Sequence, residues 1–199
     1  MALNAFLKLK GKSQGDIKGS VTQKGREGKI LVIAATHEVL SPRDAASGQA
    51  TGKRQHKPFV ITKEIDLATP RLYNMLVLNE PAAEWELQFW APKNIGAAGT
   101  GAEVQHYTVR LFNAQLCDIR FQMPNNRNPE LARYAEYEEL SFSYSKIQWL
   151  WVAGGTSAED DWLASDGSNL AAAKPGRASK AAAKRTPAAA PVASVKRKL

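Results

Sequence analysis

The chain has 199 residues, of which 44% are hydrophobic and 23% charged, so it can bury one sizeable core and is expected to form one domain with additions. The net charge of +8 resembles that of a nucleic-acid-binding protein, but residues 165–199 carry +7 of it and leave +1 for residues 1–164. The single cysteine, Cys117, excludes an internal disulfide framework and every multi-cysteine metal site, and we expect it to be a small buried side chain.

The N-terminus reads MALNAFLKLKGK and lacks the basic region and continuous apolar stretch of a cleaved signal peptide. No window of the chain approaches the roughly 18 apolar residues of a membrane span. The sequence therefore predicts synthesis in the cytosol, no membrane-spanning segment, and export, if any, by a route without a cleaved signal peptide.

From residue 5 onward the dominant hydrophobic period is two, which is typical of strands with one solvent-facing side. Trp85, Leu87 and Phe89, for example, alternate with glutamate and glutamine. We expect about seven strands, at residues 5–11, 29–40, 59–65, 85–89, 107–111, 117–123 and 140–151.

The last of these runs changes phase. Apolar side chains occupy even-numbered positions up to Tyr144 and odd-numbered positions from Ile147 onward. One extra residue in a strand produces such a change, so the pattern predicts a β-bulge near Ser145 and Lys146 and a bend in one continuous strand.

One short helix is expected between Thr69 and Asn79. Thr69 can cap it, and Pro70 fits the first helical position, where no backbone donor is needed. The apolar residues of one face are Leu72, Met75 and Leu76. One helix beside many strands predicts a mainly β fold: a compact antiparallel β-barrel of two sheets with one short α-helix against a side or end.

Signals for catalysis are scarce. The segment GAAGTG at 96–101 links strand to strand, so we interpret it as a hairpin tip rather than a phosphate-binding loop. The histidines, His37, His56 and His106, share no metal-ligand spacing and have no evident acidic partner. The acidic pairs at 138–139 and 160–161 point to opposite faces of their strands and are expected to be solvated. We expect no enzyme and no catalytic, cofactor or metal site.

Five motifs carry a family resemblance. They are GKSQGDIKGSV (11–21), GQATGKRQ (48–55), HKPFVITKEIDLATPRLYNML (56–76), QMPNNRNP (122–129) and GGTSAEDDW (154–162). Together they closely resemble the haemolysin-coregulated protein (Hcp) family, whose members form the inner tube of the bacterial type VI secretion system. The resemblance covers residues 1–162 in order and without large gaps.

The resemblance implies a structural role. Hexameric rings would stack into a hollow tube that is capped by a spike protein and works with the sheath and baseplate of the system. Sheath contraction would expel the tube, so the protein would be cytoplasmic before firing and afterwards outside the cell or in a target cell. The lumen of such a tube would also carry small effector proteins.

A long polar segment precedes the strand at 59–65. It contains Gly48, Gly52 and a cluster of cations, and it has no apolar period. In the light of the resemblance we interpret it as an arm that reaches over a neighbouring subunit, with an ordinary mobile loop as the alternative. The assembly residues expected in it are Pro42, Arg43, Gln49, Lys53, Arg54 and Gln55. Five tryptophans, including Trp149 and Trp151, exceed what the core obviously needs and also favour assembly, although core packing is the expected place of any single one.

The tail departs from the family pattern, because members that resemble this body end near the equivalent of Trp162. Residues 165–199 are rich in Ala, Lys and Pro and cannot bury enough apolar surface to fold, so we predict a domain at 1–164, a disordered basic tail, and no fused toxin. The tail is interpreted as an electrostatic tether, as a binding segment for DNA, RNA or an acidic effector, or as a remnant. The second option makes the chain a cargo- or nucleic-acid-binding module. The basic residues of the tail, which would bind the polyanion, are Lys174, Arg177, Lys180, Lys184, Arg185, Lys196, Arg197 and Lys198.

Overall fold

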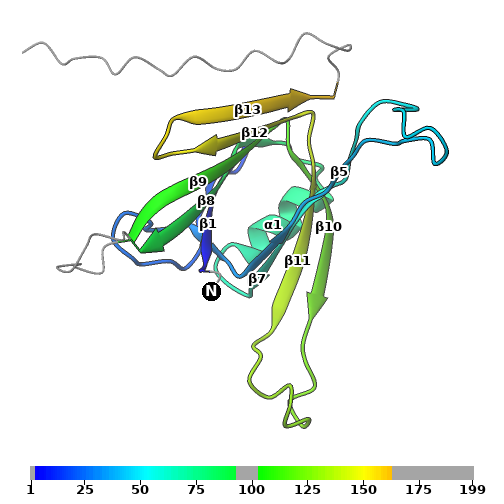
Figure 1. Cartoon of the computed structure of the whole chain (residues 1–199). Helices are drawn as coiled ribbons and strands as arrows, with labels where there is room; N and C mark the ends of the chain where they lie inside the picture. The colour runs from blue at the N-terminus through cyan, green and yellow to red at the C-terminus, as the bar shows by residue number, and fades with distance from the viewer. Residues whose placement is uncertain (1–2, 93–102, 163–199) are drawn as a thin grey trace, which may run out of the picture.

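The computed structural model describes residues 3–92 and 103–162, which form thirteen strands and one helix (Figure 1). The elements are β1 (Ala5–Gly11), β2 (Gly15–Ile17), β3 (Ile30–Val32), β4 (Ala34–Thr36), β5 (Val39–Leu40), β6 (Gln55–His56), β7 (Phe59–Glu64), α1 (Thr69–Val77), β8 (Ala82–Pro92), β9 (Glu103–Phe112), β10 (Gln115–Gln122), β11 (Tyr137–Ser143), β12 (Lys146–Trp151) and β13 (Thr156–Asp161). The predicted mainly β fold with one helix is confirmed. The expected number of strands was too low, partly because residues 29–40 divide among three sheets.

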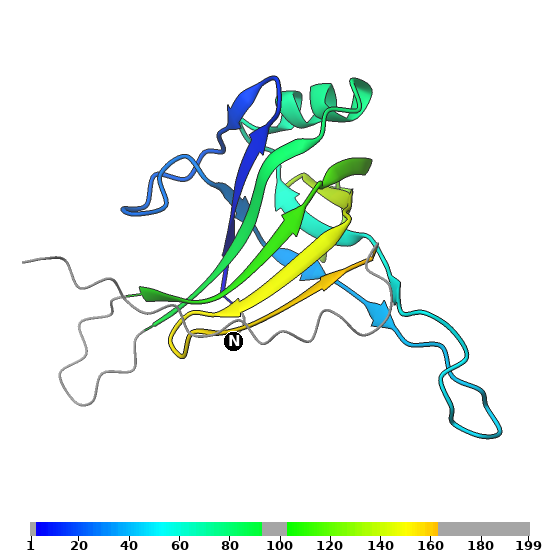
Figure 2. The same ribbon diagram turned by 90° about the horizontal axis from the view of Figure 1, so that it is seen from above.

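Two large antiparallel sheets face each other around the core (Figures 1 and 2). The seven-stranded sheet has the order β13-β12-β9-β8-β1-β2, with β3 also paired to β1, and the four-stranded sheet has the order β10-β11-β7-β4. Strands β5 and β6 form a separate two-stranded ribbon. Helix α1 lies across one end of the space between the large sheets, next to β10. The fold is thus an open barrel of two sheets.

The chain passes between the sheets at Tyr144 and Ser145, where the sequence changes its apolar phase. β11 belongs to the four-stranded sheet and β12 to the seven-stranded sheet. The backbone N–H of Ser145 donates to the carbonyl of Phe112, with 3.1 Å between nitrogen and oxygen. The predicted bulge in one continuous strand is therefore wrong. Because the sheets face each other, the core-facing positions of the chain change parity when it moves from one sheet to the other.

Aromatic contacts join the two sheets in the core. Trp85 on β8 is 2% exposed and packs edge-on against Phe59 and Phe142, with ring centroids 5.1 and 5.6 Å apart. Leu7 and Leu87 are fully buried between the sheets. Each such side chain contributes roughly 1.5–3 kcal/mol of transfer free energy to folding. Burial of alternate residues in β1, β8 and β11 confirms the two-residue period.

Helix α1 packs through the face that the spacing indicates. Leu72 and Met75 are fully buried, and Pro70 lies in the first turn. The predicted cap is wrong, because Ala68 occupies the N-cap position and the hydroxyl of Thr69 bonds to buried side chains instead. No helix within residues 3–92 and 103–162 is long and apolar enough to cross a bilayer.

A buried ion pair holds the start of α1 to the four-stranded sheet. Lys63 and Glu138 are fully buried opposite each other on β7 and β11, with 2.7 Å between Nζ and Oε1. The Lys63 ammonium also lies 2.9 Å from Asp66 Oδ1 and donates to Thr69 Oγ1 and the Glu64 carbonyl. The expectation that Glu138 is solvated is therefore wrong, because the strand register places a lysine beside it in the core.

Cys117 is exposed, which contradicts the expectation of a buried thiol. It lies in β10 where the register with β11 shifts between Leu116 and Asp118. Leu116 takes the core-facing position, and neighbouring strand residues point to opposite faces. The thiol donates a weak hydrogen bond to the Ser141 carbonyl.

We predict that Glu138→Ala lowers the free energy of unfolding by about 3–5 kcal/mol, because it leaves the Lys63 ammonium buried without its main counter-ion. Denaturant unfolding at fixed protein concentration measures the change. Replacing both partners, as Lys63→Met with Glu138→Leu, should restore most of the loss. A loss no larger than that of Glu139→Ala, on the same strand, would contradict this prediction.

Candidate assembly surface

The polar segment before β7 forms a projecting β-ribbon, seen in cyan at the upper right of Figure 1 and again in Figure 2. We call residues 38–57 the arm. Its stem is the antiparallel pair of β5 and β6, in which Val39 lies opposite His56 and Leu40 opposite Gln55. Val39 and Leu40 are each 41% exposed, so the stem presents apolar surface as well as polar groups.

Hydrogen bonds within the arm shape its tip. One carboxylate oxygen of Asp44 accepts from the backbone N–H of Ala46 and from both the N–H and hydroxyl of Ser47. These bonds, chiefly those from Ser47, lower the pKa of Asp44. The Gly48 N–H donates to the Asp44 carbonyl, and the φ of +69° at Gly48 is a conformation that favours glycine. The tip is therefore a turn that its own hydrogen bonds hold in place.

The structure gathers all six predicted assembly residues in the arm, but at two levels. Pro42, Arg43, Gln49 and Lys53 belong to the outer part, beyond the stem. Arg43 donates to the Gly48 carbonyl, and its backbone bridges to Ala50. Arg54 and Gln55 lie at the stem.

Arg54 ties the stem to the last strand. Its guanidinium donates to both carboxylate oxygens of Asp160 and, at 2.8 Å, to the Asp161 carbonyl. His56 Nε2 lies 2.8 Å from the same carboxylate. Burial raises the pKa of Asp160, but the hydrogen bonds and charges of Arg54 and His56 outweigh it and lower the pKa overall. The expectations that Asp160 is solvated and that His56 has no acidic partner are wrong.

A single phenol joins both sides of the stem. Tyr144 Oη lies 2.6 Å from Nε2 of His37, just before β5, and 2.9 Å from Nδ1 of His56 on β6. Sequence spacing carries no signal for this cluster, because its members are up to 107 residues apart. Within residues 3–92 and 103–162, no group of three or more His, Cys, Asp or Glu side chains is arranged to hold a metal ion.

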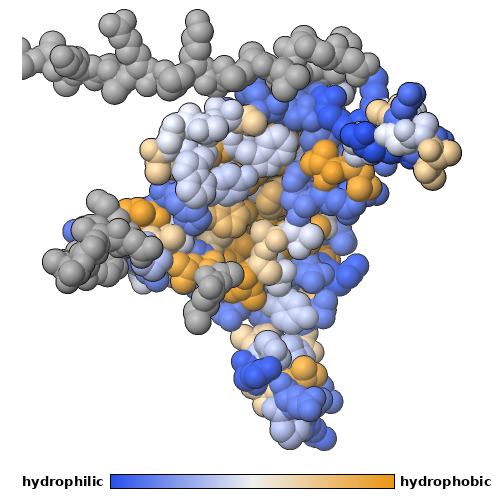
Figure 3. All heavy atoms as spheres, viewed as in Figure 1, coloured by the Kyte–Doolittle hydropathy of each residue, from blue (hydrophilic) through white to orange (hydrophobic). Residues whose placement is uncertain are grey.

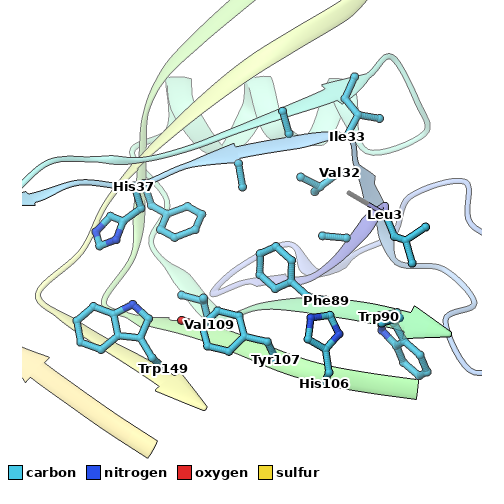
Figure 4. Close-up of a pocket in the computed structure, with 15 residues that line it drawn as sticks. Leu3, Val32, Ile33, His37, Phe89, Trp90, His106, Tyr107, Val109 and Trp149 are labelled. Carbon is cyan, nitrogen blue, oxygen red and sulfur yellow. The ribbon is translucent and has the colours of Figure 1, made fainter. Parts of the chain in front are cut away.

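An open cavity of about 720 Å³ lies between the two sheets beside the arm (Figure 4). Apolar and aromatic side chains line it, including Phe89, Tyr107 and Trp149, which Figure 4 labels. Figure 3 shows tan and orange surface in the centre of the same face of the molecule. Leu3 and Ile33 at its rim are 43% and 45% exposed. Because the cavity is open, part of the core-facing surface is uncovered in the isolated chain.

Two further tryptophans lie outside the core. Trp151 is 49% exposed and Trp162 is 48% exposed, whereas Trp85 is buried. The tail residues predicted to bind polyanions, and the segment at 96–101, lie outside the described residues.

Comparison with known proteins decides the family. The family model described as "Type VI secretion system effector, Hcp" matches residues 6–151. The chain belongs to the Hcp family of type VI secretion proteins. A curated relative, the "Major exported protein" of Pseudomonas aeruginosa, is 38% identical over an alignment of 171 positions that covers 81% of this chain and 96% of the relative.

Solved Hcp structures share the fold. A crystal structure of an Hcp protein has a TM-score of 0.72 and 31% identity, and the alignment covers 81% of this chain and all of the other. A variant of the Hcp1 protein from the E. coli EAEC 042 pathovar has a TM-score of 0.69 at 31% identity, covering 81% of this chain and 99% of that one. The family assignment places this chain in type VI secretion.

We predict that Asp44→Ala increases trypsin cleavage within the arm, because three donors at the tip lose their acceptor. Timed digestion with identification of the cut sites measures the effect. Asp118→Ala, at an exposed position on β10, is the matched control and should leave the arm as resistant as before. Equal cleavage of the two variants would show that Asp44 does not order the tip.

Proposed function

We propose that this Hcp chain is a structural subunit of the type VI secretion tube, assembling into hexameric rings that stack and are expelled. The projecting arm is the observation that carries the proposal. It holds no part of the body's core, yet its tip is ordered by its own hydrogen bonds and its stem is anchored at Asp160. Such a segment suits contact with a second copy in the same or the next ring.

The uncovered side of the barrel supports self-assembly. β4 is an edge strand of the four-stranded sheet, all three of its residues are exposed, and Ala34 and Ala35 line the open cavity. An exposed edge strand next to apolar surface invites uncontrolled pairing unless something covers it. A neighbouring subunit in a closed ring would cover both. Exposed Trp151 and Trp162 are side chains of the kind that concentrate at such contacts.

Under this proposal, the partners and the export route of the Hcp family also apply to this chain. The tube would meet the spike protein at its tip, the baseplate at its origin and the sheath around it, and small effectors would travel in the lumen. The protein would be cytoplasmic until firing and would then leave the cell without a cleaved signal peptide. The name of its relative, the "Major exported protein", supports export. No catalytic step is part of this role.

A second candidate function rests on the tail. Residues 165–199 carry a net charge of +7, and several tails on one ring would present that charge at high local concentration. Counter-ion release would then drive binding to DNA, RNA or an acidic effector. This function adds to the tube role and does not depend on the arm.

We predict that the purified chain has the mass of six copies by multi-angle light scattering. Shortening the arm between Arg43 and Lys53 should leave the hexamer and its unfolding transition intact while abolishing or weakening stacking, because this part of the arm contributes nothing to the core. Electron microscopy of filaments measures stacking. A monomeric mass at micromolar concentration would overturn the ring, and unchanged tubes in the shortened variant would overturn the role of the arm.

We predict that full-length protein binds heparin and DNA weakly at low salt and that removing residues 165–199 abolishes this binding. The retained part should still form rings, since every described strand ends by Asp161. Fluorescence anisotropy across a salt series checks both, and affinity should fall steeply as salt rises. Polyanion binding that survives truncation would assign it to the body instead.

A further inference from the structure

Five side chains meet where the arm joins the body. His37 directly precedes the arm and β5, and His56 lies in β6 of its stem. Tyr144 comes from the crossover between the sheets, Asp160 from β13, and Arg54 from the segment before β6. We propose that these five form a proton-sensitive latch that holds the arm to the body, accepts one added proton without opening, and opens when it takes a second.

When both histidines are neutral, the available donors and acceptors fix the direction of every hydrogen bond in the latch. Asp160 can only accept, so Nε2 of His56 carries the proton of that 2.8 Å contact. Nδ1 of His56 is then unprotonated and accepts a hydrogen bond from the phenol O–H of Tyr144. The phenol oxygen in turn accepts from Nε2–H of His37 at 2.6 Å. Every contact has one donor and one acceptor, and both histidines are Nε2–H tautomers.

One added proton breaks none of these bonds. On His37 it leaves every direction unchanged, because Nε2 of that ring already donates to the Tyr144 oxygen. When His56 carries the added proton, both of its ring nitrogens donate, one to Asp160 and the other to the oxygen of Tyr144. The phenol O–H then turns to Nε2 of His37, which accepts in its other tautomer. Burial and the nearby Asp160 charge raise the pKa of Tyr144, so the phenol keeps its proton throughout.

When a second proton binds, one hydrogen of the network no longer has an acceptor. Both histidines must then donate to the Tyr144 oxygen, and the phenol hydrogen has no acceptor on either ring. Two positive rings also lie with their centroids 6.3 Å apart, while the Asp160 carboxylate is already shared with Arg54. The arm's stem is the movable partner, because β5 and β6 pair only with each other.

The surroundings offer little to relieve that charge. Within residues 3–92 and 103–162, the titratable or charged side chains with hydrogen bonds to the histidine pair are Tyr144 and Asp160, and Arg54 contacts Asp160 in turn. Glu38 and Lys57, their neighbours in the chain, are exposed. The remaining contacts are aromatic, with Phe59 stacked on His37 at 5.1 Å and Trp162 edge-on to His56 at 5.6 Å.

The pKa of His37 agrees with this geometry. Burial, and secondarily the charge of His56, lower the pKa of His37 from its ordinary value of 6.5. A released arm therefore binds more protons than a latched one once the pH falls below 6.5. The stability that the latch provides is complete above that pH and is lost as the pH falls through the lowered pKa. If the arm serves assembly as proposed above, acidification of the surrounding compartment would loosen stacking.

Hydrogen exchange of the arm tests the latch directly. Mass spectrometry would follow peptides that cover residues 38–57 of the full chain, unstacked, between pH 8 and 5. His37→Gln removes the second titrating ring and keeps a polar group, and His106→Gln is the matched control outside the cluster. Comparing variants at equal pH cancels the intrinsic pH dependence of exchange.

We expect the arm in wild type and His106→Gln to lose about tenfold or more of its protection on acidification, and His37→Gln to keep it. Protection that falls equally in His37→Gln, or that is independent of pH in wild type, would overturn the latch. If core peptides show that His37→Gln is misfolded, Tyr144→Phe replaces it and should expose the arm already at pH 8. A protected arm in that variant would also overturn the proposal.

Imidazole nitrogen NMR gives a second readout at neutral pH. The latch requires both neutral histidines to be Nε2–H tautomers, whereas independent histidines have no such constraint. Stacking is measured separately by electron microscopy. An arm that opens in acid while tubes persist would support the latch and count against the arm's proposed role in stacking.

Discussion

The buried ion pair between Lys63 and Glu138 sets the geometry on which the other parts depend. It fixes the register of β7 against β11, because a slip by one residue would leave a charge in the core without its partner. The same ammonium bonds to Asp66 and Thr69, and so it determines where α1 begins. Strand β7 also follows directly on the arm's stem, so this register determines where the arm leaves the body.

The arm is coupled to the end of the described chain as well as to its own neighbours. Arg54 and His56 bind Asp160, and Trp162 packs against His56. The predicted tail follows only a few residues later. The shared carboxylate of Asp160 is the physical link between the arm and β13.

Much of the fold and part of the candidate assembly surface could be predicted from local patterns. Alternation found the main strands, Pro70 and the apolar spacing found the helix, and the polar run before β7 indicated the arm. The errors involve positions whose environment comes from distant residues. Thr69 bonds to Glu138 instead of capping α1, and the phase change at Ser145 marks a transfer between sheets. In both cases the deciding contact is made by residues far apart in the sequence, so no local pattern reveals it.

The sequence by itself determined the mainly β fold, the single helix, the location of the charge and, through its motifs, the Hcp family, because each of these depends on neighbouring residues or on an ordered set of short segments. Only the tertiary structure decided that Glu138 is buried, that Asp160 anchors the arm and that Tyr144 joins His37 to His56. These contacts depend on which strands lie side by side and in which register. That arrangement follows from burying a common core, and no spacing along the chain encodes it.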